Sequence, residues 1–234
     1  MFYSNKFYRL PPINSNLYHY AGNNPVRYVD SDGNEIKKFE ATYNMSNYPD
    51  LLGNEPSNGS TIAREGCYIT TFANLISSAI QQFETKFSEK NYSNPRLINN
   101  DKSLFLKNSG ELNGRSNSMN AIFGEENWDY WTKSGQGGSE GLLSRLSDYD
   151  KDIDGYMIVG IFDLSSATSE VTNHMVGING MPNADGIFED IVPTSNGDKS
   201  RLSDSNKKKS YCIENFKEFR VIKVTEFYKC TQGE

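Results

Sequence analysis

The chain has 234 residues, of which 36% are hydrophobic and 12% aromatic, which predicts one folded domain, or one domain with an appendage. Its net charge of −6 argues against nucleic acid as the main partner. It contains no run of about 18 apolar residues, so no membrane span is expected.

The first 36 residues differ from the rest in being dense in tyrosine and in turn-forming residues. Asn24-Pro25 and Asp32-Gly33 are both turn signals. The N-terminus has no apolar core of the kind that a secretory signal peptide requires. We therefore expect a leader over residues 1–36, one domain over residues 37–234, and either residence in the cytoplasm or export by a route without a signal peptide.

The strongest amphipathic helix is predicted at residues 64–83. Gly66 ends the preceding loop, so Cys67 is expected at the start of the helix. A thiol there faces unpaired backbone N–H groups and the positive end of the helix dipole, and both favour the thiolate. Cys67 is therefore a candidate nucleophile, and the alternative is a small apolar residue packed at a helix start. The apolar stripe consists of Ile69, Phe72, Ala73, Ile76, Ala79, Ile80 and Phe83.

The other elements predict a sheet that follows this helix in the chain. Residues 88–140 are rich in Asn, Ser and Gly and are interpreted as irregular, with short helices. A helix before an antiparallel sheet defines an α+β fold. The remaining predictions are a strand at 36–43, a helix capped by Ser139, a buried strand at 156–162, a hairpin of strands 174–180 and 187–192, and a final strand at 219–228.

Histidine is scarce, because His19 and His174 are the only two in the chain. His19 lies in the leader, so a Cys–His enzyme would use His174, which opens a predicted strand. In an antiparallel hairpin the start of one strand lies beside the end of the next, which predicts Asp190 near His174. Cys67, His174 and Asp190 would then supply a nucleophile, a base and an orienting carboxylate. Glu189, Thr194 and Asn196 are the fallback orienting residues.

Residues 14–34 resemble the end of the core of RHS/YD-repeat proteins. The resemblance rests on Asn-Leu-Tyr-His-Tyr from Asn16, on Asn-Asn-Pro ending at Pro25, and on Asp30-x-x-Gly33, with Ser31 where the family usually has proline. Such proteins carry a variable C-terminal domain, often a toxin, directly after this motif. The resemblance implies a polymorphic-toxin effector of bacterial competition, delivered into a target cell, with a cognate immunity protein as partner.

The domain after the leader resembles papain-like cysteine peptidases of the C39 type. The resemblance rests on Gly66-Cys67 with Thr70, on the valine-containing strand at 157–160, on His-Met-Val-Gly-Ile-Asn-Gly from His174, and on Asp190. It implies a papain-like fold, with the nucleophile helix packed on an antiparallel sheet, and hydrolysis of a protein or peptide without a metal or cofactor. By this resemblance Cys67 is the nucleophile, His174 the general base and acid, and Asp190 the orienting residue.

The chain departs from this family on both sides of the cysteine. Tyr68-Ile69 replaces Gly-Pro, and no Gln precedes Cys67 where the family has its oxyanion-hole side chain. The Asn58 side chain or the Cys67 N–H are the candidate donors to an oxyanion. Two alternatives remain open: a Gln deamidase or transglutaminase, which would also react through a thioester, and a non-enzymatic RHS module that binds a partner through a Tyr-rich surface.

Overall fold

The computed structural model describes residues 39–83, 90–150, 156–165, 173–204 and 208–223. It contains one five-stranded antiparallel sheet in the order β1-β5-β2-β3-β4, with helices around it, and this confirms the α+β class. The RHS-like segment 14–34, with His19, lies outside the described residues. The strands are β1 (Trp128–Thr132), β2 (Tyr156–Asp163), β3 (Asn173–Ile178), β4 (Ile191–Val192) and β5 (Phe216–Lys223).

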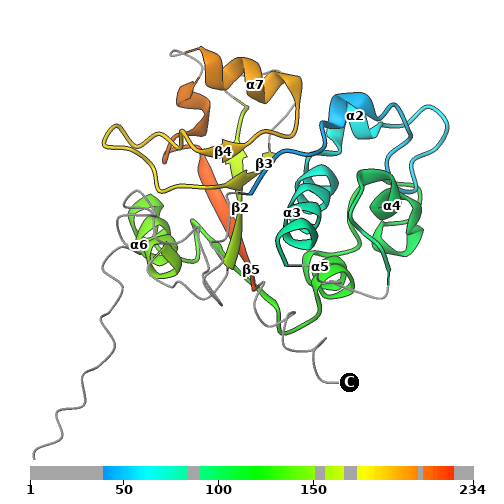
Figure 1. The fold of residues 1–234 in the computed structure, drawn as a ribbon, viewed down its shortest axis with the longest axis horizontal. Coiled ribbons are helices and arrows are strands. Elements are labelled where there is room, and N and C mark those ends of the chain that lie inside the picture. Colours follow the sequence, from blue (N-terminus) through cyan, green and yellow to red (C-terminus); the bar gives the residue numbers. More distant parts are fainter. Residues whose placement is uncertain (1–38, 84–89, 151–155, 166–172, 205–207, 224–234) are drawn as a thin grey trace, which may run out of the picture.

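The helices fall on two sides of this sheet (Figure 1). Those from α2 to α5 lie on one side and α6 lies on the other, while α7 follows β4 in the chain. The bounds, with 3₁₀ helices labelled η, are η2 (Met45–Asn47), α2 (Ile62–Glu65), α3 (Cys67–Phe83), α4 (Pro95–Asn100), η3 (Lys102–Leu104), α5 (Arg115–Phe123), α6 (Ser139–Asp150), α7 (Asn196–Ser203) and η4 (Lys208–Tyr211).

The helix α3 begins at Cys67, as its sequence pattern predicts. Gly66 ends the short helix α2 with its N–H bonded to Ile62 O, and the chain then turns directly into α3. Five residues of the predicted apolar stripe are buried, namely Ile69, Phe72, Ala73, Ile76 and Ala79, and Ile80 is half-buried. A stripe of this kind stabilises a helix mainly by burial against neighbouring elements, and here it fixes α3 against β3.

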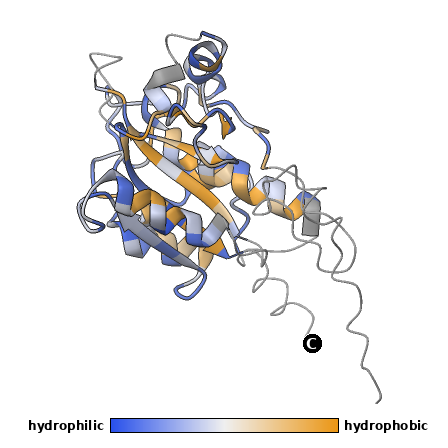
Figure 2. Cartoon of the chain, turned by 90° about the vertical axis from the view of Figure 1, so that its left-hand side faces the viewer, coloured by the Kyte–Doolittle hydropathy of each residue, from blue (hydrophilic) through white to orange (hydrophobic). Residues whose placement is uncertain are grey.

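The strand β2 is central and covered on both faces, as its continuous apolar run predicts. Met157 and Val159 belong to the core that contains α3, whereas Ile158 and Phe162 belong to a second core on the α6 side. Figure 2 shows apolar residues concentrated along the central strands and the helices against them. The sheet is therefore a rigid wall, and residues at its edge are held in fixed register.

Two segments differ from the predictions. Residues 39–43 form no strand, because side chains from other elements bind their backbone: the Asn179 amide exchanges two hydrogen bonds with Phe39, at 3.2 and 2.7 Å. Conversely, β1 lies inside the stretch interpreted as irregular, where it pairs with β5. The predicted strands 187–192 and 219–228 correspond to the shorter β4 and to β5, and residues 224–228 lie outside the described chain.

Candidate catalytic site

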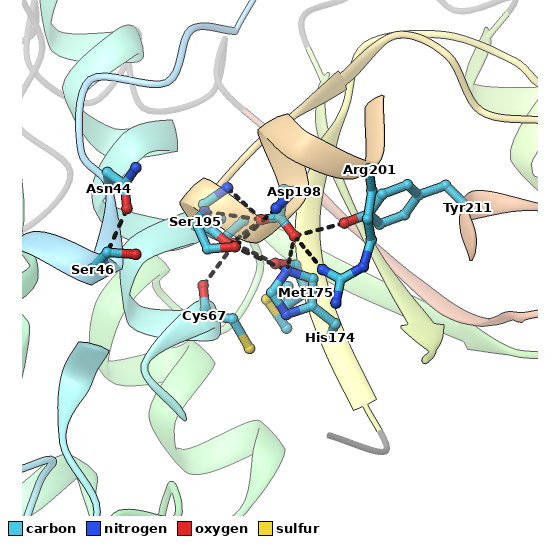
Figure 3. A network of polar contacts seen from close by, with 11 residues as sticks. Asn44, Ser46, Cys67, His174, Met175, Ser195, Asp198, Arg201 and Tyr211 are labelled. Atoms are coloured by element: carbon cyan, nitrogen blue, oxygen red, sulfur yellow. Dashed lines mark hydrogen bonds and ion pairs between the residues drawn. The ribbon is translucent and has the colours of Figure 1, made fainter. Parts of the chain in front are cut away.

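Cys67 and His174 are brought together where α3 meets the edge of the sheet (Figure 3). Cys67 is the first residue of α3, His174 is the second residue of β3, and the thiol lies close enough to the ring to contribute to the pKa of His174. The Thr71 hydroxyl lies 2.8 Å from the Cys67 carbonyl oxygen and 3.0 Å from that of Met175. This hydroxyl therefore fastens the first turn of α3 to β3 one residue from His174. Both side chains are nearly covered, with 8% of Cys67 and 5% of His174 exposed.

The partner of His174 on its other side is Asp198 of α7. The Nε2 of His174 lies 2.8 Å from Asp198 Oδ1. Since Nε2 donates to this carboxylate, Nδ1 is the ring nitrogen left for the Cys67 thiol. The three side chains form a line from thiol to imidazole to carboxylate, which is the order that nucleophilic catalysis requires.

Asp198 is fully buried and its carboxylate is held by six contacts. Oδ1 accepts from Tyr211 Oη at 2.6 Å and lies 3.4 Å from Arg201 Nη1, in addition to His174 Nε2. Oδ2 accepts from the Thr194 N–H and the Ser195 N–H, both at 2.9 Å, and from the Thr194 hydroxyl at 3.1 Å. A buried carboxylate with this many donors is kept ionised and fixed in position.

The local fold explains why Asp198 is so well placed. Ser195 and Asp198 form a capping box at the start of α7, in which the Ser195 side chain accepts from the Asp198 N–H. The segment that enters α7 is braced by η2: Met45 N–H donates to Thr194 O at 2.7 Å, and Asn44 Nδ2 donates to Asn196 Oδ1 at 2.7 Å. The capping box therefore both stabilises the start of α7 and positions the Asp198 carboxylate next to His174.

The charges of this pair shift both pKa values in the direction that stabilises an ion pair. Burial lowers the pKa of His174, but the Asp198 charge and hydrogen bond, with a contribution from Cys67, outweigh it and leave that pKa well above 6.5. Burial raises the pKa of Asp198, but His174, Tyr211 and the Thr194 N–H outweigh it and leave that pKa well below 3.8. The site therefore stabilises the positive charge of the imidazolium that forms when His174 takes a proton.

The prediction that Asp190 orients His174 is wrong. Asp190 O accepts from the Asn179 N–H, so Asp190 lies five residues along β3 from His174, about 16 Å at the usual rise of a strand. The pairing Gly177↔Val192 sets a register in which the chain runs back toward His174 only after β4. Thr194, one of the fallback residues, does reach the ring, with its hydroxyl 3.4 Å from Nε2.

The predicted oxyanion donors have different outcomes. Asn58 is exposed on a turn before α2, and no contact of the described residues links it to Cys67 or His174. The Cys67 N–H stands at the first position of α3, where an amide has no acceptor within its own helix. The Cys67 N–H therefore stays a prediction that the fold can accommodate, whereas Asn58 lacks any link to the site.

Asp198 was missed because no helix was predicted after residue 192. A signal was present in Ser195-Asn-Gly-Asp198, since Ser or Thr followed three residues later by an acid is the signature of a capping box. This signature indicates a helix start but not what the acid touches. The contact with His174 depends on the register of the hairpin, which is set by only two residue pairs, Gly177↔Val192 and Ile178↔Ile191.

Thr71→Val is expected to lower the rate at which iodoacetamide modifies Cys67 by roughly 10–100-fold, because the bridge between α3 and β3 is lost and the thiol moves relative to the imidazole. Thr71→Ser keeps the hydroxyl and should restore most of this rate. The measurement is the modification rate of Cys67 in the three proteins, with thermal unfolding to confirm folding. A Thr71→Ser protein as slow as Thr71→Val would contradict the bridge.

Comparison of the chain with protein-family models, curated proteins and solved structures finds no match. Within the described ranges, no three His, Cys, Asp or Glu side chains gather as a metal-binding group. No helix in the described part of the chain is long and apolar enough to cross a membrane. The geometry of the site itself is thus the basis for assigning a function.

Proposed function

We propose that this protein is a thiol hydrolase that cleaves peptide bonds with Cys67 as nucleophile, His174 as general base and acid, and Asp198 as the orienting carboxylate. The observation that carries the proposal is the Cys67 thiol beside the ring of His174, whose Nε2 lies 2.8 Å from the buried Asp198 carboxylate. A structural histidine would need one partner, and this one has a buried carboxylate on Nε2 and a thiol beside its ring. We propose a papain-like architecture for this site, and its support is that Cys67 begins a helix and His174 lies on a strand.

The proposed reaction uses each of these groups at a defined atom. His174 Nδ1 takes the thiol proton, and the Cys67 thiolate attacks the carbonyl carbon of the peptide bond. The imidazolium then gives its proton to the leaving nitrogen, which departs as an amine and leaves a thioester. Water attacks the thioester while His174 takes its proton, and the thiolate leaves with release of the acid. Asp198 stays ionised throughout and stabilises the imidazolium that forms.

The same thioester would serve a deamidase or a transglutaminase, which differ in the acyl donor and the attacking group. A glutamine side chain would lose ammonia on acylation, and then water or an amine would release the product. Peptide hydrolysis is the first proposal because Gly66-Cys67, His174 and the strand between them resemble C39-type peptidases. Ammonia release from a Gln peptide without chain cleavage would favour deamidase or transglutaminase chemistry, and amine incorporation would single out the transglutaminase.

The biological role that we propose follows from the RHS-like leader over residues 14–34. Residues 37–234 would act as the toxin domain of an RHS-type effector in a target cell, and an immunity protein would block the site in the producing cell. A non-enzymatic RHS module would need neither an ionised Asp198 nor a thiol against the histidine. The site therefore favours the enzyme over the binding module.

Selective alkylation tests the proposed nucleophile. At pH 7 we expect iodoacetamide, or an epoxide inhibitor of cysteine peptidases, to modify Cys67 at least about 10-fold faster than Cys212, because a thiolate paired with an imidazolium reacts and a thiol does not. Burial raises the pKa of Cys212, which is free, so it is the matched control. Peptide mass mapping of the labelled protein gives both rates.

The variant His174→Ala separates reactivity from exposure. It leaves the Cys67 side chain in place but removes the group that takes its proton, so the rate at Cys67 should fall to that of Cys212. Cys67 reacting no faster than Cys212 in the unmodified protein, or equally fast in His174→Ala, would contradict the proposed mechanism.

A further inference from the structure

A second charged cluster lies inside the protein on the α3 side of the sheet. Glu218 and Arg220 are alternate residues of β5, and Arg115 is the first residue of α5. Arg220 Nε donates to Glu218 Oε1 at 2.9 Å, and Arg115 Nη2 lies 2.7 Å from Glu218 Oε2. The side chains of Glu218 and Arg220 are only 7% and 8% exposed. None of the three belongs to the site around Cys67.

The register of the sheet places this cluster on the face that packs against the core containing Cys67. Ile161 of β2 pairs with Glu218 on one side and with Met175 on the other. Glu218 and Met175 are therefore two strands apart, about 10 Å, and Met175 follows His174 directly. Ile161 and Met175 pack in the core that also contains Cys67, so the cluster and the Cys67 thiol lie on the same side of the sheet. Figure 1 shows α3 and α5 together on that side.

The cluster has two positively charged side chains, Arg115 and Arg220, and one negatively charged side chain, Glu218. Two guanidinium groups share one carboxylate whose two oxygens are both used. Arg220 Nη1 is buried and has no hydrogen-bond partner among the described residues. An unpaired buried donor is costly, and a bound anion would accept from it and balance the second guanidinium. Burial, opposed by Glu218, lowers the pKa of Arg220, which shows how weakly its charge is compensated.

The cluster is open to solvent at one end. The Arg115 side chain is 37% exposed and stacks on the ring of Tyr130, 4.4 Å from its centroid, and Tyr130 is itself 39% exposed. Arg115 also opens α5, whose cap Gly114 has no side chain to accept from the first-turn amides. The positive end of that helix therefore adds to the charge of Arg115.

We propose that Arg115 and Arg220 form a carboxylate-binding subsite, which holds an acidic group of the substrate on the side of the sheet where Cys67 lies. The proposal rests on the peptide hydrolysis proposed above. Guanidinium groups suit carboxylates because their planar N–H pairs match the two oxygens. The carboxylate is that of a Glu or Asp side chain, or of the C-terminus of a cleaved chain.

A binding test that needs no turnover uses N-acetyl-glutamate amide, N-acetyl-alanine and N-acetyl-glutamine amide as probes. They offer a side-chain carboxylate, a terminal carboxylate and a neutral analogue. At matched ionic strength we expect one of the two acids to raise Tm by a few degrees more than the neutral analogue, because a ligand that binds the native state stabilises it. Arg115→Gln should abolish this difference, whereas Arg115→Lys should retain part of it.

The matched control is Arg145→Gln. Arg145 also makes an ion pair and stacks on aromatic rings, but it does so on the α6 side of the sheet. This variant should keep the acid-specific shift in full. An equal shift in wild type and Arg115→Gln, or no difference between the acids and the neutral analogue, would overturn the subsite.

Peptide cleavage then separates the subsite from the proposed function. On paired peptides that differ by Glu against Gln, Arg115→Gln should reduce the preference for Glu by roughly 10-fold or more, because one charged hydrogen-bonding pair is lost. Acid-specific binding without cleavage of any peptide would refute the hydrolase and leave the subsite standing. Cleavage without acid-specific binding would refute the subsite and leave the hydrolase standing.

Discussion

Cys67→Ser is expected to reduce peptide hydrolysis by roughly 10⁴-fold or more, since loss of a nucleophile removes the covalent route altogether. A serine hydroxyl is a far weaker acid than a thiol, so the imidazole of His174 does not create an alkoxide in its place. The change replaces one atom in a side chain that is 8% exposed, so the fold should be kept. The measurement is the rate of cleavage of a fluorogenic peptide mixture, with Tm as the test of folding.

The control for this variant is Cys212→Ser, which replaces the other described thiol and should cleave at the wild-type rate. The toxin proposal adds a second readout in a bacterial host. Wild type and Cys212→Ser should arrest growth, and Cys67→Ser should not. Arrest by all three proteins would show that any toxicity comes from binding, as in the non-enzymatic alternative.

The nucleophile helix could be predicted from sequence because its signals are local. The apolar stripe of α3 repeats with helical spacing, and Gly66 marks its start, so both the element and the place of Cys67 follow from a few adjacent residues. His174 could be predicted as the partner of Cys67 because the chain has only two histidines and because His174 begins a predicted strand. Such inferences need no knowledge of how distant segments meet.

The orienting carboxylate could not be predicted in the same way because it depends on where a short hairpin ends. β4 consists of Ile191 and Val192, and only their pairing with β3 decides which later residue stands opposite His174. The sequence offers Asp190 and Asp198 eight residues apart: Asp190 lies in the predicted strand 187–192, and Asp198 follows that strand. Burial decides between them: Asp198 has six donors around it, whereas the hairpin holds Asp190 at the far end of β3.

Asp198→Asn is expected to lower kcat by roughly 10²–10⁴-fold and to move the alkaline limit of activity down by roughly 1–3 pH units. The active form needs an imidazolium beside a thiolate, and activity is lost when His174 gives up its proton. Asp198 is what holds the pKa of His174 well above 6.5, so the uncharged amide lets that proton leave at lower pH. The measurement is kcat/KM against pH for both proteins.

The control is Asp190→Asn, which should leave both the rate and the pH profile unchanged, since Asp190 lies at the other end of β3. The two variants together decide between the carboxylate that the sequence predicts and the one that the structure supplies. A shift of the alkaline limit in Asp190→Asn, or none in Asp198→Asn, would show that Asp198 does not act on the histidine.

Unfolding of the same variants should show the pair as a pH-dependent contribution to stability. The folded pKa of His174 is raised, so its contribution is complete below about 6.5 and is lost as the pH rises through that folded value. The folded pKa of Asp198 is lowered, so its contribution is complete above about 3.8 and is lost as the pH falls through its folded value. Both contributions are complete between pH 3.8 and pH 6.5. In this interval Asp198→Asn should lower the free energy of unfolding by about 3 kcal/mol, as expected when one member of a buried pair is removed. Urea unfolding at pH 5.5 and at pH 10 should therefore show a larger loss of unfolding free energy in Asp198→Asn, relative to wild type, at pH 5.5 than at pH 10. An equal loss at both pH values would show that the pKa of His174 in the folded protein does not lie between them.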